Sequence, residues 1–384
     1  MIGTVGVVSL TACSLAPAPT ARTTVTPAAR SGAPGPTPAG AGSAASAHPA
    51  TAGPSAAASP RTTSAAAASV TIAAVGDMML GNTPDLPPDP ATYLEPVKGE
   101  LATGAQIVFG NLEGTLTTAT GSKCGTGAKS TNCYAFHDPP AYVRYLKGAG
   151  FTILNDANNH SMDFGPAGQA QTVQSIHAAG LAQTGLPGEI TLVKANGIRV
   201  AFLAFAPYTY TASLLDLPAA QALIRQAAKE APVVVVYMHA GAEGSDADHV
   251  TGHEEDYLGE NRGNPEAFAH LAIDSGASLV IASGPHVLRG MQFYRGHLIA
   301  YSLGNFAGYG NFGSGGNLSL SAILHVTLSA RGQFEQARLY PVEDVGKGQP
   351  TPGGDTVSFV GQLSREDFGS SAARFSPLGV IQPP

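Results

Sequence analysis

Short, continuously apolar segments alternate with longer helix-like segments over most of this chain, and this alternation restricts the fold more than any other feature. The apolar segments are rich in Val, Ile, Leu and Phe and cover residues 70–76, 106–110, 151–155, 199–206, 232–238, 278–283 and 297–303. Between them, prolines near the start and glycines near the end predict helices at 139–149, 166–180, 219–230 and 264–276. Continuous apolar runs are typical of strands that are buried on both faces. The sequence therefore predicts an α/β fold with a largely buried sheet.

The folded region is expected to extend from residue 70 to residue 345. Within it, residues 320–328 and 333–342 alternate between apolar and polar side chains and predict antiparallel strands. A region of about 275 residues is long enough to bury one large core. Residues 346–384 are rich in proline, glycine and serine, and we expect there a C-terminal tail that wraps around the domain or frays.

A second compositionally biased segment precedes the folded region. Residues 14–69 consist almost entirely of Ala, Pro, Ser, Thr and Gly, with no aromatic residue. Such a segment cannot bury enough apolar surface to offset the entropy that ordering costs, so we expect a disordered tether.

The first thirteen residues, MIGTVGVVSLTAC, are apolar and end at Cys13. The final Leu-Thr-Ala-Cys resembles the lipobox of bacterial lipoproteins, in which the cysteine carries the lipid after cleavage. The resemblance implies a lipoprotein signal peptide over residues 1–13, lipidation of Cys13, and an extracytoplasmic protein anchored to the membrane. The alternative is an apolar N-terminus with a chance cysteine. The tether that follows favours the lipobox.

The charge balance excludes one class of partner. The chain has 20 Lys and Arg residues against 27 Asp and Glu, a formal net charge of −7, and no basic cluster. Because phosphate binding along a nucleic acid requires a basic face, we predict no nucleic-acid partner. No apolar run reaches the roughly 18 residues that a membrane-spanning helix needs.

If Cys13 carries lipid, two of the three cysteines remain, Cys124 and Cys133, within KCGTGAKSTNC. The glycine-containing spacer can close a loop, so a disulfide is expected in an oxidising compartment. Metal binding is the alternative, but no further Cys or nearby His completes a set of four ligands.

Six of the predicted strands are followed by side chains of a kind that can bind a ligand. These side chains are Asp77, Asn111, Glu113, Asn159, His160, His239, Glu243, His286 and Asn305. In open α/β sheets, ligands bind at the carboxyl ends of the strands. Any single one of these residues can equally be a cap or a turn residue. Six strands that all end in this way favour a common site.

The residue types at these strand ends suit a metal. Asp77 and Glu113 supply two negative charges, and Asn159, His239 and His286 supply neutral donors. Oxygen and imidazole donors without thiolates suit Mn, Fe or Zn, as one or two divalent ions. Such a centre would attract an anionic phosphate or carboxylate group and activate water at neutral pH. In this interpretation, the neighbouring residue His160 acts as a general acid.

Six motifs then occur in a recognisable order along the chain. They are VGDMMLG (75–81), GNLEGTL (110–116), ANNHSMDFG (157–165), HAGAE (239–243), PHVLRG (285–290) and IAYSLGNF (299–306). On these motifs, residues 70–345 resemble the CapA family of poly-gamma-glutamate capsule synthesis proteins, in the calcineurin-like metallophosphoesterase superfamily. The resemblance implies a four-layer α-β-β-α sandwich with a two-metal site between loop ends. It also implies that Asn159 and His160 are the superfamily's Asn-His pair, with Asp163 as the polar contact that follows.

Three positions depart from the superfamily or family pattern. Met79 stands where an Asp-x-His motif has histidine, Glu113 stands where aspartate is usual, and Gly284 replaces the first histidine of His-Pro-His. These departures put a full two-metal centre in doubt and leave one metal ion or a weak second one. The candidates to compensate, in the polar loop 244–263, are His249, His253 and Glu255.

On the substrate side, the order along the chain places Arg262 and Arg289 near the same face. Either is a candidate to clamp an anionic group, although a surface salt bridge is the commoner role of an arginine. We also expect Asn111, Glu243 and Asn305 to contact the substrate.

Two functions therefore compete. The first is a metal-dependent hydrolase or transferase at the cell envelope, acting on an anionic polymer or a phosphoester in capsule synthesis or anchoring. The second is a non-enzymatic envelope accessory that binds an anionic polymer or a capsule synthase component. The retained ligand-type residues favour the first function, and the losses at Met79 and Gly284 favour the second.

Overall fold

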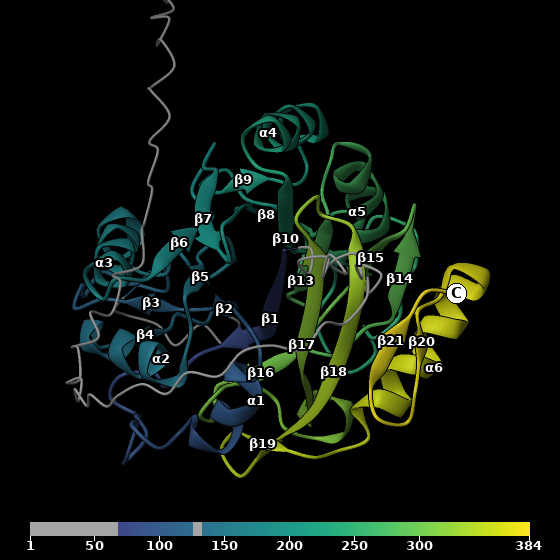
Figure 1. Ribbon diagram of the computed structural model, residues 1–384. Helices are drawn as coiled ribbons and strands as arrows, with labels where there is room; N and C mark the ends of the chain where they lie inside the picture. The colour runs from purple at the N-terminus through teal and green to yellow at the C-terminus, as the bar shows by residue number, and fades with distance from the viewer. Residues whose placement is uncertain (1–67, 126–132) are drawn as a thin grey trace, which may run out of the picture.

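Two large sheets form the centre of the protein in a computed structural model that describes residues 68–125 and 133–384 (Figure 1). The predicted signal peptide, Cys13 and nearly all of the predicted tether lie outside the described residues.

The first sheet has the order β20-β21-β18-β17-β1-β2-β5-β6, with β16 paired to β1 and β19 to β18. Its strands are β1 (Ser69–Met78), β2 (Ile107–Leu112), β5 (Ile153–Asn155), β6 (Ala182–Thr184), β16 (Asn305–Ala307), β17 (Leu320–Ser329), β18 (Phe334–Val345), β19 (Gln349–Pro352), β20 (Arg374–Phe375) and β21 (Val380–Gln382). The strands β1, β2, β5 and β6 are parallel to one another. Strand β17 is antiparallel to both of its neighbours, β1 and β18.

The second sheet has the order β14-β15-β13-β10-β8-β7, with β9 paired to β8. Its strands are β7 (Thr191–Ala195), β8 (Ile198–Ala206), β9 (Ala212–Ser213), β10 (Val233–His239), β13 (Leu279–Ser283), β14 (Met291–Tyr294) and β15 (His297–Ala300). Two small pairs complete the strands, β3 (Thr115–Leu116) with β4 (His137–Asp138), and β11 (Asp256–Tyr257) with β12 (Glu260–Asn261).

The helices are α1 (Lys98–Ala102), α2 (Val143–Ala149), α3 (Gly165–Ala178), α4 (Leu217–Glu230), α5 (Pro265–Asp274) and α6 (Thr356–Phe368). Short 3₁₀ turns occur at η1 (Glu95–Val97), η2 (Pro140–Tyr142), η3 (Gly316–Ser319) and η4 (Gly369–Ser371).

Capping side chains fix the starts of two helices. The Asp216 side chain accepts from the Ala219 N–H at the start of α4, and the Asn264 side chain accepts from the Ala267 N–H at the start of α5.

Alternate residues of the strands divide the core into layers. The core between the two sheets contains Phe109 of the first sheet, whose ring lies 5.7 Å from that of Phe202 and 5.4 Å from that of Tyr237 in the second. The other face of the first sheet packs on α1, α2 and α3, and the other face of the second packs on α4 and α5. This arrangement confirms the predicted four-layer α-β-β-α sandwich (Figure 1).

The C-terminal residues differ from the expected tail. Residues 349–382 form β19, α6, β20 and β21, and Val360 and Ile381 are buried in the core between the sheets. The proline and glycine content of 346–384 concealed a helical spacing of buried residues in α6, at Thr356, Val360 and Leu363. The folded region therefore continues past residue 345.

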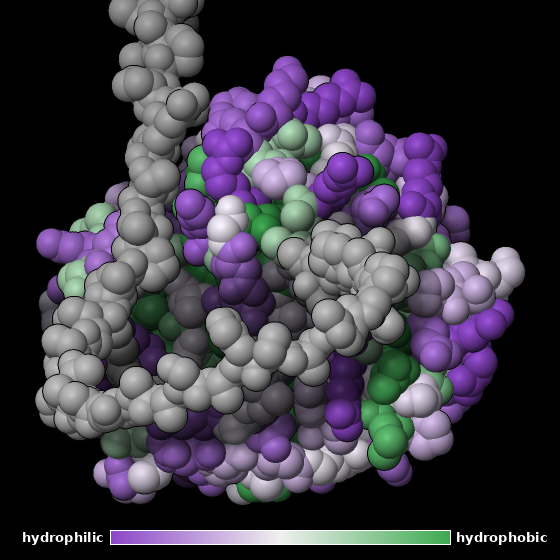
Figure 2. Space-filling model, in the orientation of Figure 1, coloured by the Kyte–Doolittle hydropathy of each residue, from purple (hydrophilic) through white to green (hydrophobic). Residues whose placement is uncertain are grey.

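The surface follows the expected division of polar and apolar residues. Hydrophilic residues gather over α4 at the top of the molecule (Figure 2), on the side opposite the residues that it buries against the second sheet. Of the helices formed by residues 68–125 and 133–384, none has the length and apolar character needed to cross a membrane.

Candidate metal centre

Asp77 is the last residue but one of β1 and is held in place by groups from both sheets. Its Oδ1 accepts from Asn111 Nδ2 at 2.7 Å and from the hydroxyl of Ser283, and its Oδ2 accepts from the Gly284 N–H at 3.2 Å. Burial alone would raise the pKa of Asp77, but the hydrogen bond and charge of His286 lower it to about 2. The side chain is therefore an ionised carboxylate inside the fold.

Glu113 follows β2 and is fully buried. Within the described part of the chain, neither of its carboxylate oxygens has a hydrogen-bond partner. Oε1 lies 3.6 Å from Nε2 of His239 and 3.6 Å from Nε2 of His286. Burial, followed by the charge of Asp77, raises the pKa of Glu113 well above its usual value. A buried carboxylate with no hydrogen-bond partner is costly unless a nearby cation compensates it.

His239 is the last residue of β10 and has one satisfied and one free ring nitrogen. Nδ1 hydrogen bonds with the Tyr237 hydroxyl at 3.2 Å, whereas Nε2 has no hydrogen-bond partner among the described residues. Burial lowers the pKa of His239 to about 3, so the imidazole is neutral. A neutral imidazole oriented through one nitrogen is the usual form of a histidine metal ligand.

Asp77, Glu113 and His239 together form the group that best fits a metal. Each offers one ligand atom, and these atoms all lie within 4.8 Å of one another at fully buried positions. The free oxygens of Glu113 and the free Nε2 of His239 are the atoms that a divalent ion would satisfy. The residues present therefore fit a bound divalent cation.

His286 lies beside this group. Its Nδ1 lies 3.3 Å from Asp77 Oδ2 and 2.9 Å from Asn305 Oδ1, and its Nε2 lies 3.7 Å from Glu243 Oε2. Burial opposes protonation, but the carboxylates of Glu113 and Asp77 raise the pKa of His286 to about 10. Asn305, expected to contact the substrate, instead holds this imidazole.

The segment ending in His160 forms the next part of the site. His160 Nδ1 lies 2.8 Å from Asp163 Oδ2, and Asp163 itself is fully buried. This contact leaves Nε2 of His160 for the neighbouring cavity, which His160 lines. Burial lowers the pKa of His160, and Asp163 partly opposes this. Asp163 is thus a residue that positions His160. Oδ1 of the preceding residue, Asn159, is buried without a hydrogen-bond partner among the described residues.

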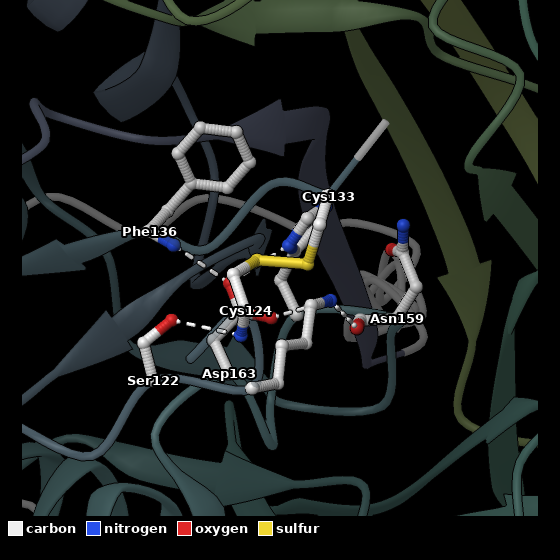
Figure 3. Close-up of a disulfide and its surroundings, with 8 residues drawn as sticks. Ser122, Cys124, Cys133, Phe136, Asn159 and Asp163 are labelled. Atoms are coloured by element: carbon white, nitrogen blue, oxygen red, sulfur yellow. Dashed lines mark hydrogen bonds and ion pairs between the residues drawn. A yellow bond between two sulfur atoms is a disulfide. The ribbon is translucent and has the colours of Figure 1, made fainter. Parts of the chain in front are cut away.

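A disulfide and the residues on either side of it lie next to Asp163 of this pair (Figure 3). Cys124 and Cys133 are bonded, as the sequence predicted, with their Cα atoms 5.7 Å apart. On one side of the disulfide, Lys123 Nζ pairs with Asp163 Oδ1 at 2.7 Å and donates to the Asn159 carbonyl at 3.1 Å. On the other side, the Phe136 N–H donates to Asp163 Oδ2 at 2.7 Å. Both ends of the loop therefore fix Asp163.

An asparagine network explains why residues 155–163 are so polar. Asn111 Oδ1 accepts from Asn155 Nδ2 at 2.6 Å and from Asn158 Nδ2 at 3.0 Å, while its Nδ2 donates to Asp77. Asn111 was predicted to contact the substrate; in the structure its Nδ2 is engaged with Asp77 and its Oδ1 with Asn155 and Asn158. Sequence reasoning missed the supporting roles of Asn155 and Asn158, together with those of Tyr237 and Ser283.

The two candidate clamp arginines are both engaged. Arg289 is buried, and its guanidinium donates to both carboxylate oxygens of Glu255, at 3.1 and 2.7 Å, and to the Ala247 carbonyl. The guanidinium of Arg289 is therefore already engaged by Glu255 and a backbone carbonyl. Arg262 Nη2 lies 2.9 Å from Glu243 Oε1 at the edge of the site.

These contacts also remove two candidate compensating ligands. Glu255 is committed to Arg289, and His249 Nδ1 lies 2.6 Å from Asp367 Oδ1. Gly284 has φ +114°, a conformation that residues with side chains rarely adopt, and a Cβ there would lie 3.2 Å from the ring of His239. The backbone at residue 284 therefore does not suit a histidine.

Two sheets packed face to face between helices, with carboxylates and imidazoles gathered at the carboxyl ends of their strands, define a layered α/β protein with a buried candidate metal site. Residues 71–309 match the model of the family described as Bacterial capsule synthesis protein PGA_cap, and the chain belongs to this family. The family prediction made from the sequence motifs is confirmed.

Two curated relatives are similar over part of their length. The chain is 30% identical to the PGA biosynthesis protein CapA of Bacillus subtilis (strain 168) over 230 residues, which cover 55% of each protein. It is 32% identical to the Capsule biosynthesis protein CapA of Bacillus anthracis over 184 residues, or 43% of this chain and 42% of that protein. The chain thus spans about half the length of the curated relatives it matches.

Solved structures show a more distant similarity. A putative 5'-nucleotidase from Staphylococcus aureus is 13% identical with a TM-score of 0.41, over 79% of this chain and 59% of that one. The purple acid phosphatase PPD1 of yellow lupin is 11% identical with a TM-score of 0.36, over 74% of this chain and 53% of that one.

Proposed function

We propose that this protein is a metal-dependent hydrolase or transferase that acts on an anionic polymer or phosphoester during capsule synthesis or anchoring. The observation that carries the proposal is the group formed by Asp77, Glu113 and His239. These side chains are fully buried and close together, and both carboxylate oxygens of Glu113 and Nε2 of His239 have no hydrogen-bond partner among the described residues. Perturbed ionisable groups in such an arrangement are typical of functional sites.

The candidate metal ligands fall into two groups. Asp77, Glu113 and His239 would hold the ion, and Asn159 and His286 would complete its surroundings. The oxygen and imidazole donors suit Mn, Fe or Zn. When bound, the divalent ion supplies Lewis-acid polarisation of the reacting anionic group and water activation. The losses at Met79 and Gly284 favour one ion over two.

His160 is the candidate proton donor. Asp163 accepts from Nδ1 and stabilises the protonated imidazolium form of His160, and from this form Nε2 can deliver a proton to a leaving group in the adjacent cavity. This assignment requires no contact between Asp163 and the substrate.

The names of the two curated relatives support a role in capsule synthesis. Their names refer to PGA biosynthesis and capsule biosynthesis, and these names support an anionic capsule polymer or its phosphoester precursor as substrate. A role beside capsule synthase components at the cell envelope is consistent with the same names.

The second candidate, a non-enzymatic accessory, is favoured by one observation. The positive φ of Gly284 disfavours an imidazole at the position where many family members have one. In this alternative, the site binds an anionic polymer or a synthase partner without turnover.

The two candidates are separated by metal analysis of the purified protein combined with a panel of phosphoester and gamma-glutamyl substrates. The enzyme proposal expects a bound divalent metal and metal-dependent turnover of at least one substrate, lost in Asp77→Ala. If the protein binds no divalent metal at micromolar concentration, the enzyme proposal is wrong and the accessory function is favoured.

For the location of the protein, we propose a lipid anchor at Cys13 and an extracytoplasmic domain. The Leu-Thr-Ala-Cys sequence and the biased segment after it support this proposal. Expression of Cys13→Ser in a bacterium that processes lipoproteins should release the protein from the membrane fraction. A variant that stays membrane-bound would refute the anchor.

A further inference from the structure

A cavity of about 300 Å³ opens directly beside the candidate metal centre. His160 and His286 line its inner end, so it is continuous with the site described above. We call it the aromatic pocket, defined by the residues Tyr134, Phe136, Tyr257 and Phe312 together with Asn311 and Glu243. Its volume is at the small end for ligand sites, which fits a single ring.

Aromatic rings flank both imidazoles at the inner end of the aromatic pocket. The Phe136 ring lies 4.7 Å from the His160 ring, and the Phe312 ring lies 5.1 Å from the His286 ring. These two phenylalanines come from separate loops. Any group joined to an anion at the metal centre would therefore lie between apolar aromatic surfaces.

The charge of the aromatic pocket is unsuited to carboxylates. Among its described lining residues there is no Lys or Arg, and Glu243 is the carboxylate. The nearby Arg262 is buried and paired with Glu243 and Glu260, at 2.9 and 3.3 Å. Lys123 is paired with Asp163. The imidazole of His286 also lines the pocket, but it is already engaged by Asp77, Glu113 and Glu243. A substrate segment bearing a carboxylate on each residue would therefore meet the charge of Glu243 without an unpaired cation among the described lining residues.

Two polar groups point to hydroxyls as the complementary feature. Asn311 Nδ2 is buried and has no hydrogen-bond partner among the described residues, so it can donate to a ligand. The Glu243 carboxylate can accept from a ligand hydroxyl. Aromatic faces carry partial negative charge and attract the weakly positive C–H groups of a saturated ring. Together these features match a neutral, hydroxylated ring.

We infer that the aromatic pocket binds an uncharged sugar ring joined to the anionic group that the metal centre receives, so that the substrate class is a sugar phosphate or sugar phosphodiester. This inference rests on the proposed function and deepens it. It also separates the substrate of this site from a bare poly-gamma-glutamate chain, which carries a carboxylate on every residue.

The test compares three probes on the full-length protein loaded with Mn²⁺. The probes are glucose 1-phosphate, glycerol 3-phosphate and tri-gamma-glutamate, measured by calorimetric binding and, for the two phosphates, by phosphate release. We expect glucose 1-phosphate to bind more tightly than glycerol 3-phosphate. Phe312→Ala should weaken the binding of glucose 1-phosphate by about three- to tenfold and change that of glycerol 3-phosphate little, while Phe312→Tyr should restore it.

Tyr134→Ala is a second variant in case Phe312→Ala folds poorly, since Tyr134 is 60% exposed. Tyr145→Ala, on α2 and outside the aromatic pocket, is the matched control and should change neither affinity. Equal affinity for the two phosphates, or preferential binding of tri-gamma-glutamate with the same dependence on Phe312, would overturn the inference. Ring-dependent binding without phosphate release supports the pocket assignment and contradicts the hydrolysis of phosphomonoesters at the metal centre. Phosphate release without ring preference supports the enzyme proposal and contradicts the pocket assignment.

Discussion

Two buried charged clusters lie close together in this protein and differ in one respect. Arg289 and Glu255 are paired through two hydrogen bonds, and the remaining guanidinium nitrogen of Arg289 donates to a carbonyl. In the other cluster, neither Glu113 oxygen has a hydrogen-bond partner among the described residues, and Nε2 of His239 has none either. The charges of the Arg289–Glu255 cluster are therefore satisfied by hydrogen bonds. The Glu113–His239 cluster has buried atoms that can bind a metal ion.

This difference indicates which buried charge belongs to the scaffold and which to a site. A paired and fully hydrogen-bonded charge needs nothing further, and breaking it leaves its partner uncompensated. A cluster with free buried oxygens and a free imidazole nitrogen gains from a cation. Residue type alone does not separate the two, since both contain a buried glutamate.

His160 should give the largest effect, because it combines a satisfied nitrogen with one that faces the cavity. His160→Gln should lower kcat by about 10²–10⁴-fold, since it removes a positioned proton donor. The metal content should stay unchanged. Steady-state kinetics and metal analysis on the same preparation would check this, and a variant that loses its metal would contradict the assigned role.

Breaking the Arg289–Glu255 pair should lower stability rather than kcat. Arg289→Met leaves the Glu255 charge buried without its partner, and we expect a loss of about 3–5 kcal/mol in the free energy of unfolding. Denaturant unfolding measures this loss. In the matched control, Arg289→Met combined with Glu255→Gln should recover much of it, and the folded fraction of either variant should still bind metal. Loss of metal binding in folded protein would place Arg289 in the site.

The disulfide should have a smaller effect that links stability to the His160 pair. Replacing both Cys124 and Cys133 by serine should lower the free energy of unfolding by about 2–3 kcal/mol, as expected for closure of a loop of about ten residues. Because Lys123 and Phe136 both contact Asp163, kcat should fall more than KM changes. Thermal unfolding and kinetics of the double variant test this, and unchanged kcat would show that the loop does not support the pair.

Asp344 provides a buried carboxylate outside both clusters, with one oxygen unpaired among the described residues. Burial raises the pKa of Asp344 to about 8. Since the folded pKa exceeds the unfolded value, the native protein should lose stability as the pH rises from about 4 to about 8. Asp344→Asn removes this contribution and should stabilise the protein at pH 8 by at least about 1 kcal/mol, with little effect at pH 4. Equal stabilisation at both pH values would contradict the raised pKa of Asp344.

Much of the fold and the centre of the site could be predicted from the sequence. Continuous apolar runs identified the buried strands, and the rule that ligands bind at carboxyl ends of strands identified Asp77, Glu113 and His239. Both signals are local. They depend on the residue types within one strand and on the residues immediately after it.

The supporting contacts could not be predicted in this way, because they join residues that are far apart in the sequence and lie on different strands. Ser283 on β13 donates to Asp77 on β1 and hydrogen bonds with Tyr237 on β10, and no sequence spacing reveals that these strands meet. For the same reason, Arg289 and Arg262 could not be told apart before their carboxylate partners were known. In α6 the signal was present in the spacing of Val360 and Leu363, but composition obscured it.

The most direct test of the difference between the two clusters is a calorimetric titration of the metal-free protein with Mn²⁺ and Zn²⁺, with Glu113→Gln as control. We predict that the wild-type protein binds a divalent ion with micromolar or tighter affinity, and that the affinity rises with pH because protons must leave His286 and Glu113. Glu113→Gln should lose this binding while remaining folded. No binding to the wild-type protein, or equal binding to Glu113→Gln, would show that the unpaired buried atoms do not form a metal site.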